Sequence, residues 1–482
     1  MAAPDQESFG VRFKRRLPQY IAASAACLGG FSLGCGLGWS APCVEILKEE
    51  HEYDQFATDL VASVFPLGAA LGIIVVPFLI DKIGRKWTML SLVPPFLLGW
   101  VLITVGVSVV VLMAIGRLIT GACGGMFCVV APMYSAEISE KQIRGRLGVF
   151  FQLLLVFGIL FAFCCGYAKN VAIISSLCGG APLLFASVMI FMPESPLYYI
   201  MKDNEAAARK AMLYFRGPDF DIEPEIREFK VSYLPRKVAS SRLNERFRQE
   251  QVEKTRAHKV SIEAFMHRPI LKTMMLAYGM MFAQQFSGIN AIIFYCESVF
   301  RLTGVDLDSM FQMVIVAVVQ VEACLISAAL IDKLGRKILM LVSMGVMGVC
   351  LGSLAIFFLV KSSDSEQASG LSWLPLVATC TYILAFCLGA GPIPWAYMGE
   401  IFPPNIKGAA SSSAAFFNWM LAFIVTVSFS TAVRILGSAA TFFFFAFVCL
   451  GAFVFLMFFM IETKGKTFVE IQQELGIYGI YD

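Results

Sequence analysis

Twelve apolar stretches, each about 20 residues long, recur along this chain of 482 residues. A stretch of that length is what an α-helix needs to cross the hydrocarbon core of a bilayer. Charged residues make up only 15% of the sequence and hydrophobic residues 58%, whereas a soluble domain averages about 25% charged residues. The sequence therefore predicts an all-α membrane protein with twelve transmembrane helices. It argues against a disordered chain, a secreted disulfide scaffold and a nucleic-acid-binding protein.

The distribution of basic residues predicts how the spans are oriented. Lys and Arg gather in the N-terminus, in the loops that follow the second, fourth, eighth and tenth spans, in the long polar insert and after the last span. All of these lie on one side of a twelve-span arrangement, and the positive-inside rule assigns that side to the cytosol. We expect a multi-pass protein of the plasma membrane with both termini cytosolic. The predicted spans lie near 19–40, 58–80, 87–107, 110–134, 147–167, 171–192, 270–298, 310–331, 338–360, 372–398, 409–433 and 438–460.

The reactive side chains point to no enzyme. The 14 cysteines include no CxxC pair or metal-ligand spacing, and the 3 histidines fall in polar loops. Free cysteines of this kind are usually small buried hydrophobes. The spans contain no nucleophile motif and no phosphate-binding loop. We therefore expect no metal, no cofactor and no catalytic residue.

Three short motifs occur twice, in the same order, about half the chain apart. Residues 81–86, Asp-Lys-Ile-Gly-Arg-Lys, return at 332–337 as Asp-Lys-Leu-Gly-Arg-Lys, and two further carboxylate motifs repeat likewise. This is the parallel-repeat plan of transporters that move two halves around a central site. We expect two six-helix bundles at 1–192 and 270–461, a cytosolic linker with short helices at 193–269 and a cytosolic tail at 462–482.

The repeated motifs pair acidic with basic residues at fixed spacing. Positive-inside topology explains basic loops, but it does not explain carboxylates in register with them. A gate needs charges that pair in one state and separate in the other. We expect a network of ion pairs across the cytosolic face when the protein is open outward, formed by Arg85, Glu137, Arg144, Glu194, Arg336, Glu400, Lys407 and Glu462.

As a set, these motifs resemble the sugar porter family of the major facilitator superfamily. Further matches are Pro-Glu-Ser-Pro at 193–196, Gln-Gln-Phe-Ser-Gly-Ile-Asn at 284–290 and Gly-Pro-Ile-Pro-Trp at 391–395. The segment 37–42 resembles the insect branch of facilitated trehalose transporters. The resemblance implies the major facilitator fold and passive movement of a hexose or disaccharide by alternating access. It implies a small-molecule sugar substrate and a lipid bilayer, and neither a nucleic acid nor an obligate protein partner.

Uncharged amides within the apolar spans are candidates for binding a neutral sugar. Burying such a side chain in the hydrocarbon core costs free energy unless it binds a ligand or forms hydrogen bonds. Trp395 follows two prolines and offers an aromatic surface to the sugar ring, whereas Trp419 has either an interfacial or a packing role. The alternative reading is that the amides only hold helices together. The candidates for substrate binding are Gln152, Gln284, Gln285, Asn290, Gln320, Trp395 and Asn418.

One carboxylate keeps a second mechanism open. Proton-coupled sugar porters resemble this chain but carry an Asp where it has Gly36, so uniport is the simplest expectation. Glu322 lies in the eighth span, where it could titrate with a proton, bind a hydroxyl or pair with Arg117. Proton-coupled symport through Glu322 and a sensor that binds sugar without transporting it stay open as alternatives.

Overall fold

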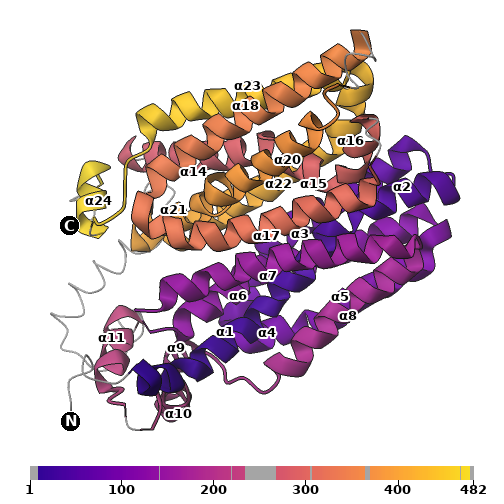
Figure 1. Ribbon diagram of the computed structural model, residues 1–482. Coiled ribbons are helices and arrows are strands. Elements are labelled where there is room, and N and C mark those ends of the chain that lie inside the picture. The colour runs from indigo at the N-terminus through magenta and orange to yellow at the C-terminus, as the bar shows by residue number, and fades with distance from the viewer. Residues whose placement is uncertain are drawn as a thin grey trace.

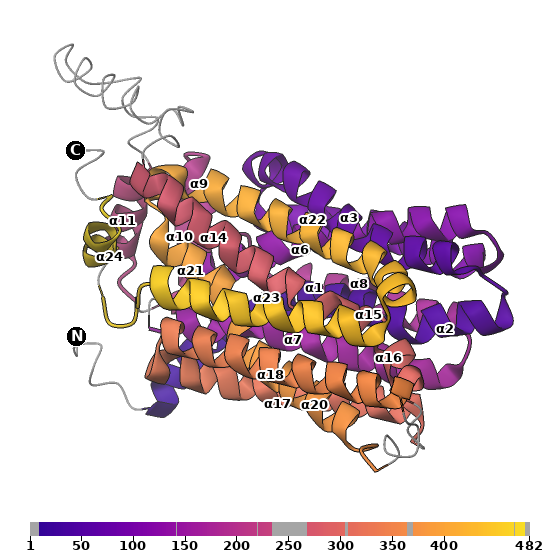
Figure 2. The ribbon, with the colours of Figure 1, turned by 90° about the horizontal axis from the view of Figure 1, so that it is seen from above.

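The computed structural model describes residues 9–140, 142–218, 220–233, 268–303, 307–363, 370–466 and 468–477. In these residues every regular element is a helix, and 11 helices are long and apolar enough to cross a membrane. Figures 1 and 2 show two bundles side by side, one from the first half of the chain and one from the second. The prediction of an all-α membrane fold with two bundles is confirmed.

The first bundle follows the predicted spans closely. Asp54 caps the second span by accepting a hydrogen bond from the Ala57 N–H at 2.8 Å, and Gly84 ends it with a φ of 91°. Short 3₁₀ turns at 106–108 and 166–168 extend α5 and α7. The α-helices are α1 (Phe9–Gly38), α2 (Ser40–Glu50), α3 (Gln55–Ile83), α4 (Arg85–Ser91), α5 (Val93–Val105), α6 (Val110–Ile138), α7 (Arg144–Cys165) and α8 (Val171–Met189).

Glycines let α3 and α6 pack backbone against backbone. A Cβ on Gly121 would lie 2.1 Å from the carbonyl oxygen of Phe65, and one on Gly68 would lie 2.2 Å from that of Leu118. Small residues at membrane helix interfaces allow this close approach, because lipid supplies no hydrophobic drive for helices to associate. The α3–α6 pair therefore forms a rigid centre for the first bundle.

The second bundle repeats this arrangement, and three short helices lie between the two. The connecting helices are α9 (Pro196–Met201), α10 (Glu205–Arg216) and α11 (Glu223–Tyr233); residues 234–267 of the predicted linker lie outside the described ranges. The second bundle comprises α14 (Arg268–Phe286), α15 (Ile289–Phe294), α16 (Cys296–Thr303), α17 (Ser309–Leu334), α18 (Arg336–Ser363), α20 (Leu374–Ala385), a π-helix at Phe386–Ala390, α21 (Ile393–Ile401), α22 (Pro404–Leu436) and α23 (Ser438–Phe459), before the short α24 (Phe468–Glu474).

The predicted span at 270–298 is not one continuous helix. Gly288 has a φ of 86°, and a Cβ there would lie 2.8 Å from the ring of Phe445. That left-handed conformation is one that glycine adopts readily. It separates α14 from α15, and Tyr295 ends α15 before α16 begins. The seventh span, predicted at 270–298, is therefore built from three helices, because a glycine required for a turn lies within an apolar stretch.

The predicted span at 372–398 is also interrupted. The chain changes from α20 to a π-helix at 386–390 and then restarts as α21 after Gly391. Pro392 and Pro394 lack the N–H groups that would continue the helical hydrogen bonds. The interruption leaves backbone carbonyls available to side chains of neighbouring helices.

Candidate functional site

Four predicted amides of the second bundle form one chain of hydrogen bonds. Gln285 Nε2 donates to Asn418 Oδ1 at 2.9 Å, and Asn418 Nδ2 donates to Gln284 Oε1 at 2.7 Å. Asn290 Nδ2 donates to Gln285 Oε1 at 2.5 Å. All four side chains are between 2% and 9% exposed. They hold α14, α15 and α22 together in this state.

The same chain reaches the interruption in the tenth span. Gln284 Nε2 donates to the carbonyl oxygens of Ala390 and Gly391, at 2.6 and 2.9 Å. These are carbonyls that the π-helix and the following prolines leave without helical partners. Trp395 lies four residues beyond Gly391, half-buried against the apolar core. The amide chain and Trp395 are thus joined through one broken segment.

Two further predicted amides are not part of that chain. Gln152 of α7 is half-buried and Gln320 of α17 is buried, and neither forms a hydrogen bond with any residue that the structure describes. The helices α7 and α17 pack against each other where the two bundles meet. Buried polar groups almost always have a hydrogen-bond partner. Gln152 and Gln320 are therefore the amides with capacity left for a ligand.

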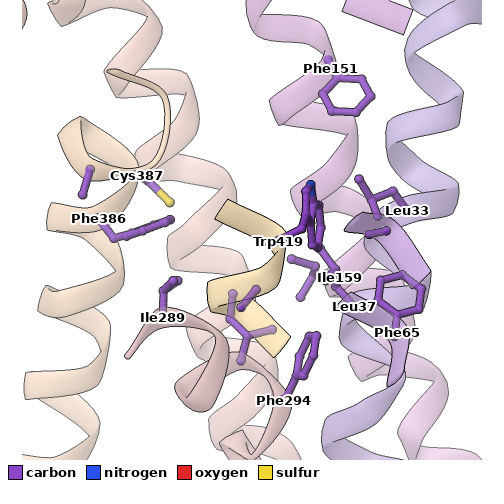
Figure 3. Close-up of a cluster of buried hydrophobic side chains, with 14 of the residues drawn as sticks. Leu33, Leu37, Phe65, Phe151, Ile159, Ile289, Phe294, Phe386, Cys387 and Trp419 are labelled. Atoms are coloured by element: carbon purple, nitrogen blue, oxygen red, sulfur yellow. The ribbon is translucent and has the colours of Figure 1, made fainter. Parts of the chain in front are cut away.

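Trp419 lies in the packed interior between the two bundles and not at the membrane–water interface. Of the two roles expected for it, it therefore has the packing role. Figure 3 shows its indole from α22 in one buried cluster with Leu37 of α1, Ile159 of α7 and Phe294 of α15. The indole Nε1 is buried and has no partner among the described residues. Because Asn418 precedes Trp419 by about 100° of helix rotation, the first can face α14 while the second faces the first bundle.

The predicted charged residues of the first bundle form a compact network at the basic end, the end of each bundle that carries Arg85, Arg144, Arg336 and Lys407. Arg85 donates to Glu137 Oε1 through Nε at 3.0 Å and Nη2 at 2.8 Å. Glu194 accepts the backbone N–H of Arg85 at 3.1 Å and that of Lys86 at 2.9 Å. Burial raises the pKa of Glu194, and these backbone donors oppose the rise. Ser195 Oγ donates to the second oxygen of Glu137.

The second bundle repeats that network group for group. Arg336 donates to Glu400 Oε1 at 3.2 and 3.0 Å, and Glu462 accepts the backbone N–H of Arg336 at 2.9 Å. Thr463 Oγ1 donates to Glu400 Oε2 at 2.5 Å, in the place of Ser195. Glu462 is less buried than Glu194, and its backbone donors outweigh the effect of burial and lower its pKa.

Six of the eight predicted gating residues thus pair within their own bundle. Arg144 is exposed without an ion pair to any described residue, and Lys407 Nζ donates to the carbonyl of Gly399 at 2.5 Å. At the basic end, no ion pair among the described residues joins the two bundles. Pairing across the bundles was expected of the outward-open state, and it stays a prediction.

A carboxylate that the sequence analysis did not select joins the bundles at the opposite, acidic end, the end that carries Glu45, Glu49 and Asp59. Asp59 Oδ1 of α3 accepts from Tyr295 Oη at 2.9 Å and from Ser430 Oγ at 2.6 Å. Ser298 also bonds Glu45, and Arg301 pairs with Glu49. These are all the side-chain hydrogen bonds between the bundles that the described residues show. The bundles are therefore fastened together at the acidic end. The sequence feature that could have identified Asp59 is its position as a carboxylate just inside the predicted span 58–80.

Arg117 is fully buried in the first bundle and is satisfied by neutral acceptors. It donates to the carbonyl oxygen of Gly36 and to Ser40 Oγ, both at 2.7 Å, and to the carbonyl oxygen of Val61 at 3.2 Å. The guanidinium also lies 4.4 Å from the centre of the Phe65 ring. The pairing of Glu322 with Arg117 that the sequence left open does not form. Glu322 lies on the exposed face of α17.

These features define a class of protein. Two membrane bundles related by an internal repeat, with matching charged networks at one end and buried uncharged amides where they meet, are the parts of a transporter with the major facilitator fold. The family described as "Sugar (and other) transporter" matches residues 25–475, and the chain belongs to this family.

Two relatives and one solved structure illustrate the likeness. The chain is 34% identical over 457 residues to the facilitated trehalose transporter Tret1 of Bombyx mori, covering 95% of this chain and 86% of the relative. It is 34% identical over 462 residues to Tret1 of Polypedilum vanderplanki, covering 95% and 88%. The inward open structure of the xylose transporter XylE from E. coli matches with a TM-score of 0.74 at 22% identity, over 94% of this chain and 98% of that one. The structural likeness confirms the fold, and the relatives are transporters rather than enzymes.

Proposed function

We propose that this protein is a uniporter that moves trehalose or a hexose passively across the plasma membrane by alternating access. The basic end is cytosolic in this proposal, as the positive-inside rule favours. The relatives named as facilitated trehalose transporters support the substrate class. The observation that carries the passive mechanism is the contact between Arg117 and Gly36.

A proton-coupled carrier needs a group that gains and loses a proton during the cycle. A carboxylate beside a buried guanidinium is such a group, because the cation controls when the proton binds. Here the position beside Arg117 is a glycine, and the guanidinium bonds its carbonyl. A Cβ on Gly36 would lie 2.5 Å from the Phe65 ring, so the packing leaves no room for an aspartate there. The symport alternative is not favoured.

A neutral sugar would bind where the bundles meet. Gln152 from the first bundle and Gln320 from the second supply free amides on two helices that pack together. Gln284, Gln285, Asn290 and Asn418 supply further donors and acceptors if the chain of hydrogen bonds rearranges around the substrate. Trp395 supplies an aromatic surface to the C–H face of the sugar.

Alternating access then requires the polar contacts between the bundles to break at the acidic end and to form at the basic end. In the present state the bundles are joined through Asp59 at the acidic end, and each charged network at the basic end is closed on itself. In the opposite state, we propose, Arg85, Arg144, Arg336 and Lys407 exchange carboxylates with the other bundle and close the basic end.

Uptake into proteoliposomes that contain only this protein tests the proposal. Labelled trehalose and labelled glucose are compared in wild type, Gln320→Ala and the matched control Ser353→Ala. Among the described residues, Ser353 bonds only its own helix, to the carbonyl of Val349. We expect saturable uptake that falls at least tenfold in Gln320→Ala alone. Uptake of glucose without trehalose would assign the substrate as a hexose, whereas binding without uptake of either sugar would contradict transport and support a sensor.

A further inference from the structure

Helix α17 presents one face to the outside of the molecule, and a carboxylate lies on it. At 100° per residue, the exposed residues of its central turns fall along one stripe, which we call the α17 face: Val318, Glu322, Leu325, Ile326 and Ala329. Gln320 and Ser327 lie on the opposite, buried side. Glu322 forms no hydrogen bond or ion pair with any described residue.

Glu322 is also far from both ends of the helix. It follows Ser309 by 13 residues and precedes Leu334 by 12, which at 1.5 Å per residue is roughly 18–20 Å from each end. The hydrocarbon core of a bilayer is about 30 Å thick. Glu322 therefore faces lipid close to the middle of the membrane, where ionisable side chains are rare and costly.

The internal repeat shows that the fold does not need this carboxylate. The step of 251 residues that relates Asp81 to Asp332 also relates Leu71 of α3 to Glu322. Leu71 is exposed, as are Ile74 and Val75, which correspond to Leu325 and Ile326. The same face exists in both bundles, and only the second bundle carries a polar residue at this position. That residue therefore requires an explanation particular to the α17 face.

We propose that the α17 face is the contact surface between two copies of this chain in the membrane, with the two Glu322 side chains hydrogen-bonded to each other at a twofold axis. A residue close to a twofold axis meets its own copy. In its protonated form a carboxyl group carries both a donor and an acceptor, so two such groups satisfy each other. Polar side chains that bond across helices stabilise association in lipid.

A second copy fits this face better than a partner helix with a basic side chain. Around Glu322 the α17 face is apolar, from Val318 to Ala329, and it offers nothing to a basic group except the carboxylate itself. A Lys or Arg at that depth in another protein would carry its own cost of leaving water. Pairing two neutral carboxyl groups places no net charge in the membrane.

Energy transfer between full-length copies with donor and acceptor tags on their C-termini, in vesicles diluted progressively with lipid, tests the proposal. We expect wild-type copies to associate at low density and Glu322→Leu to weaken association at least tenfold. Glu322→Gln, whose amide keeps a donor and an acceptor, should stay within threefold of wild type. Leu71→Ala is the matched control on the equivalent face and should not change association.

A second measurement locates the contact. Oxidative cross-linking of Ile326→Cys, which keeps Glu322, should give more dimer than that of Val75→Cys, the equivalent position on α3, with the same 14 native cysteines in both variants. Thermal unfolding equal to wild type shows that each variant is folded. Monomeric wild type in pure lipid would overturn the proposal and leave a different membrane protein as the partner. Undiminished association of Glu322→Leu, or equal cross-linking at both positions, would also overturn it.

Discussion

Arg117 and Gly36 are joined by a hydrogen bond of 2.7 Å from a guanidinium Nη1 to a backbone carbonyl oxygen, deep within the first bundle. The ring of Phe65 packs against both residues: it lies 4.4 Å from the Arg117 guanidinium and directly beside Gly36. The contact gives the buried cation an acceptor that cannot titrate. It therefore connects one glycine of the first span to the passive mechanism proposed for the protein.

The packing around Gly36 predicts that even a methyl group is too large there. In Gly36→Ala, the new Cβ would lie 2.5 Å from the Phe65 ring, and overpacking of this kind costs about 1–3 kcal/mol. We expect a lower unfolding temperature in detergent. Gly352→Ala in α18 is the control, because a Cβ there has no neighbour within 4 Å. Equal stability of the two variants would contradict the packing described.

Loss of the Asp59 carboxylate should open the acidic end. Asp59→Ala removes the acceptor in the first bundle to which Tyr295 and Ser430 donate, and leaves Tyr295 Oη only the carbonyl oxygen of Thr426 in its own bundle, at 3.2 Å, among the described residues. A hydrogen bond to a charged group is worth about 1.5–3 kcal/mol. We expect the distance between labels on α2 and α16 to lengthen in a larger fraction of molecules. Gln55→Ala is the control, because Gln55 bonds Asp59 from within the first bundle. A distance distribution like that of wild type in Asp59→Ala would show that Asp59 does not hold the bundles together.

Removing a carboxylate should destabilise the protein more in one charged network than in the other, although the hydrogen bonds of the two networks match. Arg85 is 5% exposed, whereas Arg336 is 20% exposed. Breaking a buried pair costs about 3–5 kcal/mol, and solvent screens the more exposed one. We expect Glu137→Gln to lower the unfolding temperature more than Glu400→Gln does. The reverse order would mean that burial does not set the strength of these pairs.

The N-terminal end of α1 should detach in acid. Burial alone would raise the pKa of Glu140, but the hydrogen bond from Gln19 and the charges of Arg15, Arg16 and Arg216 lower it below the ordinary value. A carboxylate whose pKa is lowered by folding stabilises the folded state fully above the ordinary glutamate pKa of about 4.3. That contribution is lost as the pH falls through the pKa that the carboxylate has in the folded protein. The protection of the amides of residues 14–19, taken as the exchange rate relative to an unstructured chain at the same pH, should therefore be high at pH 7 and lower near pH 3. In Glu140→Gln the protection should be low at both pH values, and high protection in that variant at pH 7 would exclude the carboxylate as the anchor.

Much of the architecture could be predicted because it follows from local composition. Apolar length gives the spans, and the repeated Asp81 and Asp332 motifs give the two bundles. The break at Gly288 could not be predicted, because a glycine within an apolar stretch is compatible both with a continuous helix and with a left-handed turn. Only the close approach of Phe445 shows which one forms.

The candidate site was predicted as a set of residues but not as an arrangement. Gln284, Gln285, Asn290 and Asn418 were recognisable as amides in apolar spans, yet their mutual pairing depends on how α14 and α22 approach each other. The role of Asp59 depends on two residues more than 230 positions away, Tyr295 and Ser430. Contacts of that range follow from the tertiary fold and not from local sequence.

The most direct test of passive transport is the initial rate of trehalose uptake into proteoliposomes with and without an inward proton gradient. We expect equal rates, because no carboxylate faces Arg117 at Gly36 and Glu322 lies on the outer face of α17. The same equality should hold in Glu322→Gln. A rate that rises severalfold with the gradient, and loses that rise in Glu322→Gln, would contradict uniport and make this carboxylate the coupling group.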